Sequence, residues 1–255
     1  MKRFENETVL VTGSSYGIGK GIALGFGKEG ANVIVNYSKS EAPALETVSE
    51  IKKYGANAIA VKANVAKADE VKAMVDKTIS EFGSIDILVN NAGTNGKIAP
   101  IEELTEDDYD HIMDTNVKSM FLCVVNVVPY LLKNGKGRII NMGSVDSFVG
   151  DENFSVYVTS KGAAAAFTRS LSLELGPKNI TVNAICPGFV DTPSADIIEK
   201  IYPGAKESTV KRIPRGRLLI PADIANLALF LASDDADMIN GACVLIDGGN
   251  INNIF

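Results

Sequence analysis

TVLVTGSSYGIGKGIALGFGKEG, residues 8–30, carries a β-branched apolar run into a glycine-rich turn and then into a helix-forming segment. Gly13, Gly17 and Gly19 crowd that turn. Glycine tolerates positive φ and lets backbone N–H groups approach a ligand, and a helix N-terminus adds partial positive charge for a pyrophosphate. Strand, turn and helix in this order indicate a dinucleotide-binding turn, although the spacing G-x-x-x-G-x-G differs from the usual G-x-G-x-x-G. The alternative is a glycine turn used only for close helix packing.

The rest of the chain alternates short β-branched runs with longer helical patterns, which predicts βαβ units around a parallel sheet. We expect strands at Thr8–Thr12, Asn32–Tyr37, Ala58–Lys62, Ile85–Asn90, Arg138–Met142, Thr181–Ile185 and Ala242–Asp247. These runs are nearly continuous in apolar residues, which is typical of strands covered on both faces. Helices are expected between them, including Asp69–Phe82 and Asp107–Leu132. Since no repeat or linker interrupts the series, we predict one domain over residues 1–255.

Composition indicates a globular protein and limits its partners. The chain has 255 residues, of which 46% are hydrophobic and 22% charged, and its formal net charge is -6. This acidic balance disfavours nucleic acid or an anionic membrane surface as a partner. The N-terminus lacks the apolar region of a signal peptide, and no apolar run approaches the ~18 residues of a membrane span. We therefore expect a cytoplasmic protein.

The cysteines and the single histidine form no metal motif. Cys123, Cys186 and Cys243 are widely separated within apolar segments, which favours buried free thiols over a disulfide framework. His111 has no second histidine with which to share a metal. We expect no metal site.

A serine, a tyrosine and a lysine form the candidate reactive set. Tyr157 and Lys161 are four residues apart in a segment that is expected to be helical, so both side chains lie on one face. A positive charge near a phenol lowers its pKa from about 10, which makes the pair a candidate general acid and base for an alcohol or carbonyl oxygen. Ser144, at the end of a buried strand, could hydrogen-bond the same oxygen. The alternative is an ordinary solvated helix pair.

The end of the second expected strand bears on the choice of nucleotide. An acidic residue there would hold the adenosine 2′-hydroxyl and repel a 2′-phosphate. The first carboxylate is Glu41, after the run Asn36, Tyr37, Ser38, Lys39, Ser40. We therefore favour NADP(H), with Ser38, Lys39 or Ser40 as phosphate contacts. NAD(H) stays possible, because polar residues at this point also simply end strands.

Two asparagine positions in the middle of the chain are further candidates. Asn90–Gly93 follows the fourth expected strand, where open parallel sheets present ligands, although Asn and Gly also form plain turns. Asn116 lies in the expected helix Asp107–Leu132 among apolar neighbours. If its amide is buried rather than solvated, it needs a partner such as a backbone carbonyl, a water or Lys161.

The segment over residues 189–214 follows the sixth expected strand. Pro193, Pro203 and Pro214 break it, so it cannot form one long helix. Its place beyond the carboxyl end of a strand predicts a substrate-covering loop.

Taken together, these motifs resemble the short-chain dehydrogenase/reductase family over essentially the entire chain. The matching stretches are TGSSYGIG at Thr12–Gly19, NNAG at Asn90–Gly93, PGFVDT at Pro187–Thr192 and DGG at Asp247–Gly249. Asn116, Ser144, Tyr157 and Lys161 fall where the family has its catalytic tetrad. Each motif is weak alone, but their order within one chain is highly specific.

The resemblance implies an α/β fold, a Rossmann-type doubly wound parallel sheet of seven strands in the order 3-2-1-4-5-6-7 with helices on both faces. It implies hydride transfer between a nicotinamide and a carbonyl/alcohol pair. Tyr157 is then the general acid in reduction and the base in oxidation, Lys161 lowers the pKa of Tyr157 and binds the ribose, Ser144 polarises the substrate oxygen, and Asn116 holds a proton-relay water. Tetramers through the helices around 107–132 and 157–175 are common in the family, so we expect a homo-oligomer, either a tetramer or a dimer.

The resemblance also implies a set of nucleotide contacts. They are Gly13, Ser15, Tyr16, Gly17, Ile18, Gly19, Tyr37, Ser38, Lys39, Asn64, Val65, Asn91, Ala92, Gly93, Tyr157, Lys161, Pro187, Gly188, Val190 and Thr192. Two positions depart from the family pattern: NADP-preferring relatives often have arginine where this chain has Tyr16, and aspartate where it has Asn64.

The sequence does not decide between three substrate classes: a 3-oxoacyl thioester, a sugar and a small ketone. An apolar wall is indicated by Phe148, Val149, Phe154 and Phe189. Binding of hydroxyl groups is indicated equally by Asp146, Asp151, Glu152 and Asn153. The alternative function is a catalytically silent dinucleotide-binding or sensing protein. A sugar-nucleotide epimerase or dehydratase ranks last, because it normally has a larger C-terminal portion.

Overall fold

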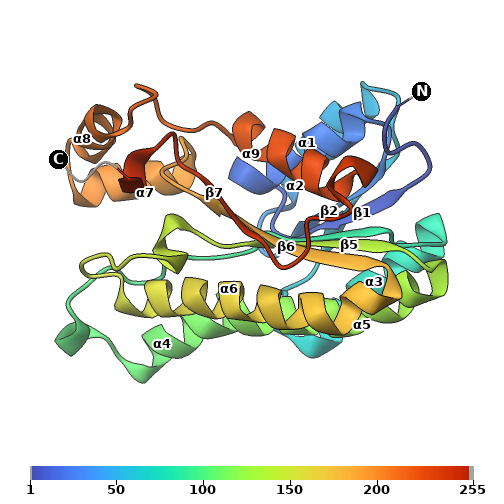
Figure 1. Cartoon of the computed structure of the whole chain (residues 1–255), viewed down its shortest axis with the longest axis horizontal. Helices are drawn as coiled ribbons and strands as arrows, with labels where there is room; N and C mark the ends of the chain where they lie inside the picture. Colours follow the sequence, from blue (N-terminus) through green and yellow to red (C-terminus); the bar gives the residue numbers. More distant parts are fainter. Residues whose placement is uncertain (1, 253–255) are drawn as a thin grey trace.

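Parallel strands form a single seven-stranded sheet in the computed structural model of the chain, which describes residues 2–252 (Figure 1). The order is β3-β2-β1-β4-β5-β6-β7, with every neighbouring pair parallel. The strands are β1 (Thr8–Val11), β2 (Asn32–Tyr37), β3 (Ala58–Lys62), β4 (Ile87–Asn90), β5 (Gly137–Met142), β6 (Ile180–Pro187) and β7 (Cys243–Ile246). The predicted Rossmann-type sheet is confirmed, while both ends of the predicted domain 1–255 lie outside the described residues.

Helices cover both faces of the sheet, because successive residues of a strand point to opposite sides. In β1, Val9 and Val11 belong to one hydrophobic core and Leu10 to the other. Figure 1 shows a helical layer on each side of the sheet. One core is covered by α1 (Gly17–Lys28), α2 (Glu41–Lys52) and α9 (Pro221–Ala232), and the other by α3 (Ala68–Phe82), α5 (Ser119–Asn134) and α6 (Ser155–Leu175).

The strand boundaries agree with the predictions to within two residues, which is the usual uncertainty of such limits. The functionally relevant difference is in β6, which continues to Pro187 instead of ending at Ile185. The ladder with β7 continues here, since the N–H of Gly188 donates to the carbonyl of Ile246 (2.9 Å). Pro187 and Gly188 are therefore held at the carboxyl edge of the sheet.

The helix predicted over Asp107–Leu132 is interrupted. Glu106–Met113 (α4) and α5 are α-helical, but Asp114–Lys118 between them has π-helical hydrogen bonding. A π segment shifts the side chains relative to a regular α-helix and is frequent at functional positions. This one contains Asn116, which is 2% exposed.

By length and hydropathy alone, the helical run Glu106–Asn134 could cross a membrane. In the fold, Cys123, Val127 and Leu131 on this run pack in the core between the sheet and its helices. Its first turn also carries three acidic residues. Packing in the core therefore accounts for the hydropathy of the run's inner face.

The segment after β6 contains two short helices in place of the predicted loop. They are α7 (Pro193–Ile201) and α8 (Ala205–Arg212). The Glu199 carboxylate stabilises the turn between them, because it accepts the N–H groups of Gly204 and Lys206 (both 2.8 Å). Figure 1 shows both helices at the end of the sheet where β6 finishes.

Candidate active site

A cleft of about 960 Å³ runs along the carboxyl edge of the sheet, from the glycine turn after β1 to Tyr157 and Lys161 on α6. Every predicted nucleotide contact lines this cleft except Val190, which lines a neighbouring cavity. The fold thus gathers these residues from widely separated parts of the chain.

The glycine turn fits a pyrophosphate. Gly13 and Gly17 have φ values of 59 and 58°, a left-handed conformation that glycine adopts without strain. A Cβ atom at Gly19 would lie 2.4 Å from both the Gly13 carbonyl oxygen and Asn91 Nδ2. Because α1 begins at Gly17 without a side-chain cap, its first N–H groups are available to phosphate oxygens.

Polar side chains from the strands beside β1 hold this turn. Asn36 on β2 accepts a hydrogen bond from the N–H of Gly13 (3.0 Å) and donates to the carbonyl of Ala63 (3.1 Å). Asn91, after β4, donates to the carbonyls of Thr12 and Gly13 (2.9 and 3.0 Å). Our sequence analysis gave Asn36 no role in the turn, although a polar residue inside the apolar run NVIVNY was the available signal.

At the adenosine end, the cleft is lined by Tyr37, Ser38 and Lys39 but not by Glu41. Glu41 instead accepts a hydrogen bond from the Tyr37 hydroxyl (2.9 Å). The Asn64 side chain accepts the N–H two residues further on (3.1 Å), so it shapes its own turn at the rim. A 2′-phosphate here would meet the ammonium group of Lys39, while the Glu41 carboxylate lies outside the cleft lining.

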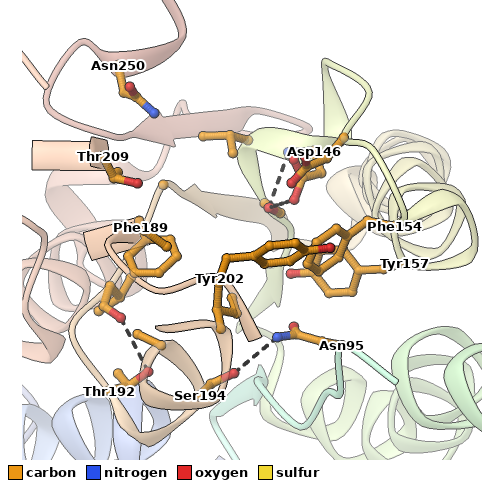
Figure 2. A pocket seen from close by; sticks show the side chains of 18 of the residues that line it. Asn95, Asp146, Phe154, Tyr157, Phe189, Thr192, Ser194, Tyr202, Thr209 and Asn250 are labelled. Carbon is orange, nitrogen blue, oxygen red and sulfur yellow. Dashed lines mark hydrogen bonds between the residues drawn. The ribbon is translucent and has the colours of Figure 1, made fainter. Parts of the chain in front are cut away.

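A second cavity, of about 510 Å³, adjoins the cleft and is lined in part by α7 and α8 (Figure 2). Ser144 and Tyr157 line both the cleft and this cavity. A nicotinamide in the cleft and a small molecule in the cavity would therefore meet at these two side chains.

The surroundings of Tyr157 raise its pKa, whereas we expected Lys161 to lower it. Loss of solvation is the largest cause, the negative charge of Asp146 adds to it, and the Ser144 hydroxyl opposes it. Lys161 Nζ lies 5.5 Å from the centre of the phenol ring and donates to the Met142 carbonyl (2.9 Å). The expectation was wrong because burial and the charge of Asp146 determine the direction of the shift, and Lys161 is not among the groups that cause it; Tyr157 keeps its proton at neutral pH.

Lys161 is 7% exposed. Burial lowers its pKa to about 8, and nearby Cys186 and Asp146 partly offset this effect. The side chain is therefore mostly charged at pH 7 but loses its charge only slightly above that pH.

Asn116 is buried and its amide has three hydrogen-bond partners. Its Oδ1 accepts the N–H of Thr94 (2.8 Å), and its Nδ2 donates to the Thr94 carbonyl (2.9 Å) and to Ser160 Oγ (3.0 Å). The Thr94 carbonyl is a partner of the expected kind, whereas Lys161, the other side chain that we had considered, is not a partner. Asn116 lines neither the cleft nor the cavity; it fixes the chain after β4 against α6.

Two side-chain hydrogen bonds connect α7 and its C-terminal end to the rim of the cavity. Asn95 Nδ2 donates to Ser194 Oγ, and Asn153 Nδ2 donates to the Tyr202 hydroxyl (both 3.3 Å). In Figure 2 the Tyr202 side chain extends across the cavity toward Phe154. Sequence reasoning placed Asn95 and Tyr202 only within the segments 94–98 and 189–214, which were expected to lie over the nicotinamide, and it assigned neither residue a contact, because only the fold shows which side chains meet.

The cavity is lined both by apolar residues and by polar residues that were expected there. Phe154 and Phe189 line it, but Phe148 and Val149 do not, and these two are 49% and 43% exposed. The expected polar residues all line it, namely Asp146, Asp151, Glu152 and Asn153. The apolar wall is therefore smaller than predicted.

Comparisons with known proteins agree with this geometry. A family model described as enoyl-(acyl carrier protein) reductase matches residues 13–250. The 3-oxoacyl-[acyl-carrier-protein] reductase FabG of Staphylococcus aureus strain Mu50 is 42% identical over 244 residues, which cover 95% of this chain and 97% of that protein. The chain belongs to the short-chain dehydrogenase/reductase family.

Other relatives agree with this assignment. The hydroxynaphthalene reductase-like protein Arp2 of Metarhizium robertsii is 40% identical over 256 residues, which cover 96% of this chain and 95% of that protein. The crystal structure of levodione reductase matches with a TM-score of 0.92 at 31% identity, over 97% of this chain and 98% of that one.

As a short-chain dehydrogenase/reductase, the protein is an NAD(P)-dependent oxidoreductase that acts on carbonyl and alcohol groups. The named activities of its relatives give no support to the alternative of a catalytically silent dinucleotide sensor.

Proposed function

We propose that the protein reduces a carbonyl substrate with NADPH, and that Tyr157 donates the proton to the substrate oxygen. The meeting of the cleft and the cavity at Tyr157 and Ser144 is the observation that carries this proposal. The raised pKa of Tyr157 supports the direction of reduction, because the protonated phenol is the form that can donate. NADPH, when bound, supplies the hydride.

The other residues of the set act around Tyr157. The Ser144 hydroxyl donates a hydrogen bond to the substrate oxygen and so polarises the carbonyl. The Lys161 ammonium stabilises the phenolate that forms as Tyr157 gives up its proton, and it holds the nicotinamide ribose. Asn116 is a positioning residue, since its amide fixes the chain at Thr94 against α6.

The charged side chains at the adenosine end of the cleft favour NADP(H) over NAD(H). Lys39 lines that end and forms no ion pair among residues 2–252, while the carboxylate of Glu41 is engaged with Tyr37. Tyr16 replaces the arginine of many NADP-preferring relatives, and it is 63% exposed at the cleft. NAD(H) is therefore a possible second cofactor.

The whole chain acts as a single nucleotide-binding domain, and residues 189–214 cover the substrate cavity. The hydrogen bonds from Asn95 and Asn153 to α7 and Tyr202 support this covering role. We further propose a cytoplasmic homo-oligomer, a tetramer or a dimer. An exposed apolar stripe on α5 supports self-association, and the three free cysteines agree with a reducing compartment.

Replacement of Tyr157 by phenylalanine tests the proposed chemistry. We expect Tyr157→Phe to lower turnover in a cofactor-coupled absorbance assay by about 10²- to 10⁴-fold, because the general acid is lost. Fluorescence titration should show that the variant still binds NADPH, and wild-type protein should bind NADPH more tightly than NADH.

Tyr109→Phe provides the matched control, because Tyr109 is 46% exposed on α4 and lines neither cavity. This variant should retain wild-type turnover. Turnover near the wild-type value in Tyr157→Phe would refute the assigned role of the phenol, and tighter binding of NADH would refute the cofactor preference.

A further inference from the structure

The substrate cavity is lined by more negative than positive side chains. Its carboxylates are Asp146, Asp151 and Glu152, and its one lining cation within residues 2–252 is Arg212. Burial raises the pKa of Asp151, and the positive charge of Arg212 partly offsets this rise. Asp146 forms no ion pair among the described residues, and it lies beside the two groups proposed to act on the substrate oxygen, Ser144 and Tyr157.

The Asp146 carboxylate accepts a hydrogen bond from the Ser144 hydroxyl. Ser144 Oγ donates to Asp146 Oδ2 (2.9 Å), and the N–H of Asp146 donates back to Ser144 Oγ (3.2 Å) (Figure 2). A serine hydroxyl has one proton, so Ser144 cannot donate to a carbonyl substrate while it donates to Asp146. The other carboxylate oxygen, Oδ1, accepts no hydrogen bond from residues 2–252.

We infer that the substrate is an uncharged carbonyl compound with hydroxyl groups near its carbonyl, such as a keto-sugar, and that Asp146 selects it. A substrate hydroxyl donates a hydrogen bond to the Asp146 carboxylate and so replaces Ser144 as its donor. The Ser144 hydroxyl is then free to turn its proton to the substrate carbonyl. This inference rests on the proposed function, because it assigns Ser144 to the substrate oxygen.

Charge in the cavity agrees with an uncharged substrate. An anionic substrate would place a second negative charge close to Asp146, which is unfavourable in a partly buried site. A simple ketone would also bind poorly, because Ser144 would have to leave a charge-assisted hydrogen bond that nothing replaces. The aromatic rings of Phe154, Phe189 and Tyr202 provide apolar contact for the carbon skeleton.

A pair of four-carbon ketones tests this inference. We would measure kcat/KM with NADPH for 1,3,4-trihydroxybutan-2-one and for butan-2-one, and use S-acetoacetyl-N-acetylcysteamine as the 3-oxoacyl thioester. Wild-type protein should prefer the hydroxylated ketone over butan-2-one by roughly 10- to 100-fold, the range expected for one hydrogen bond to a charged group. It should also prefer it over the thioester.

Variants at Asp146 distinguish substrate selection by this residue from a general loss of activity. Asp146→Asn keeps the size but removes the charge, and Asp146→Leu accepts no hydrogen bond. Both should lose most of the preference, measured at one pH as the ratio of kcat/KM for the hydroxylated ketone to kcat/KM for butan-2-one, because the substrate hydroxyl loses its charged acceptor. The control Asp107→Asn makes the same charge change at an exposed position of α4 outside both cavities and should keep the preference.

Each other outcome has a distinct meaning. If wild-type protein reduces butan-2-one or the thioester as well as the hydroxylated ketone, the inference is overturned and the proposed function stands. An equal loss on both ketones in the Asp146 variants also overturns it, since Asp146 then has only a structural role. If none of the three compounds is reduced while NADPH binds, both the inference and the proposed function fail.

Discussion

Asp146 places a negative charge beside the two side chains of the site whose pKa values depart most from their ordinary range. It raises the pKa of both Tyr157 and Lys161, and burial raises its own pKa. Lys161 and Asp151 also act on Asp146, the first lowering and the second raising its pKa. The protonation of the site is therefore set by several residues together and not by the Tyr157–Lys161 pair alone.

A pH profile follows from these shifts. Lys161 has a pKa of about 8 because burial disfavours the ammonium, so it becomes neutral as the pH rises through that value, while Tyr157 stays protonated. We expect kcat/KM for NADPH in the reduction reaction to fall above pH about 8, since this parameter reports ionisations of the free enzyme. In Asp146→Asn, loss of the charge that raises the pKa of Lys161 should move this fall to lower pH. An unmoved profile would contradict the assignment to Lys161, and Asp107→Asn should leave the profile unchanged.

At the scale of elements, the glycines of the turn after β1 and of α1 have two different roles. Gly13, Gly17 and Gly19 form the turn, where a side chain would distort the backbone or fill the phosphate site. One turn and two turns further along α1, Cβ atoms at Gly21 and Gly25 would lie 2.5 Å from Pro221 and 3.3 Å from Ala225 on α9. Close helix packing therefore accounts for Gly21 and Gly25, while nucleotide binding stays the proposed role of the first three glycines.

The two helices over the cavity are tied together by Lys206. Its ammonium on α8 donates to Asp196 on α7 (2.6 Å) and to Asp191 before α7 (2.8 Å). The segment that these contacts connect carries Tyr202 and much of the cavity lining. Lys206 thus links the geometry of α7 and α8 to that of the cavity.

Removal of the Lys206 contacts should make α7 and α8 more mobile without unfolding the protein. We expect Lys206→Met to speed amide hydrogen exchange over residues 193–212 and to raise KM for the carbonyl substrate, while the melting temperature changes little because exposed ion pairs stabilise weakly. Lys211→Met is the matched control, since Lys211 pairs with Glu207 within α8 only. If both variants give the same exchange and the same KM, Lys206 has no special role in the cover.

For the molecule as a whole, the outer face of α5 is unusually apolar. Phe121, Val125 and Leu132 are 52%, 52% and 42% exposed and share one face of the helix. On α6, which covers the same side of the sheet, Leu173 is 80% exposed. Contiguous exposed apolar side chains of this kind mark interaction surfaces, in agreement with the proposed self-association.

Oligomeric state in solution checks this surface. We expect wild-type protein to be a dimer or tetramer by light scattering after size exclusion, and Phe121→Lys to shift it to a smaller species, because a charge would be buried in the interface. Leu45→Lys adds the same charge at a residue 51% exposed on α2, on the opposite side of the sheet, and should change nothing. A monomeric wild-type protein would rule out this interface.

Local patterns in the sequence determined the strands and their succession along the chain, the glycine turn and the positions of Ser144, Tyr157 and Lys161, whereas the order of the strands in the sheet was expected from the family resemblance. Apolar runs, glycine conformations and i,i+4 spacing act over a few residues, so the chain itself displays them. The parallel sheet then places the ends of distant strands along one edge.

Only the tertiary structure decided the protonation of Tyr157, the π segment at Asn116 and the lining of the substrate cavity. Burial and the charge of Asp146 raise the pKa of the phenol, although sequence spacing alone favoured the opposite shift. Phe148 and Asp146 are two residues apart, yet one is largely in solvent and the other faces the cavity. Solvation and long-range contacts depend on how segments pack, and no short stretch of sequence contains that information.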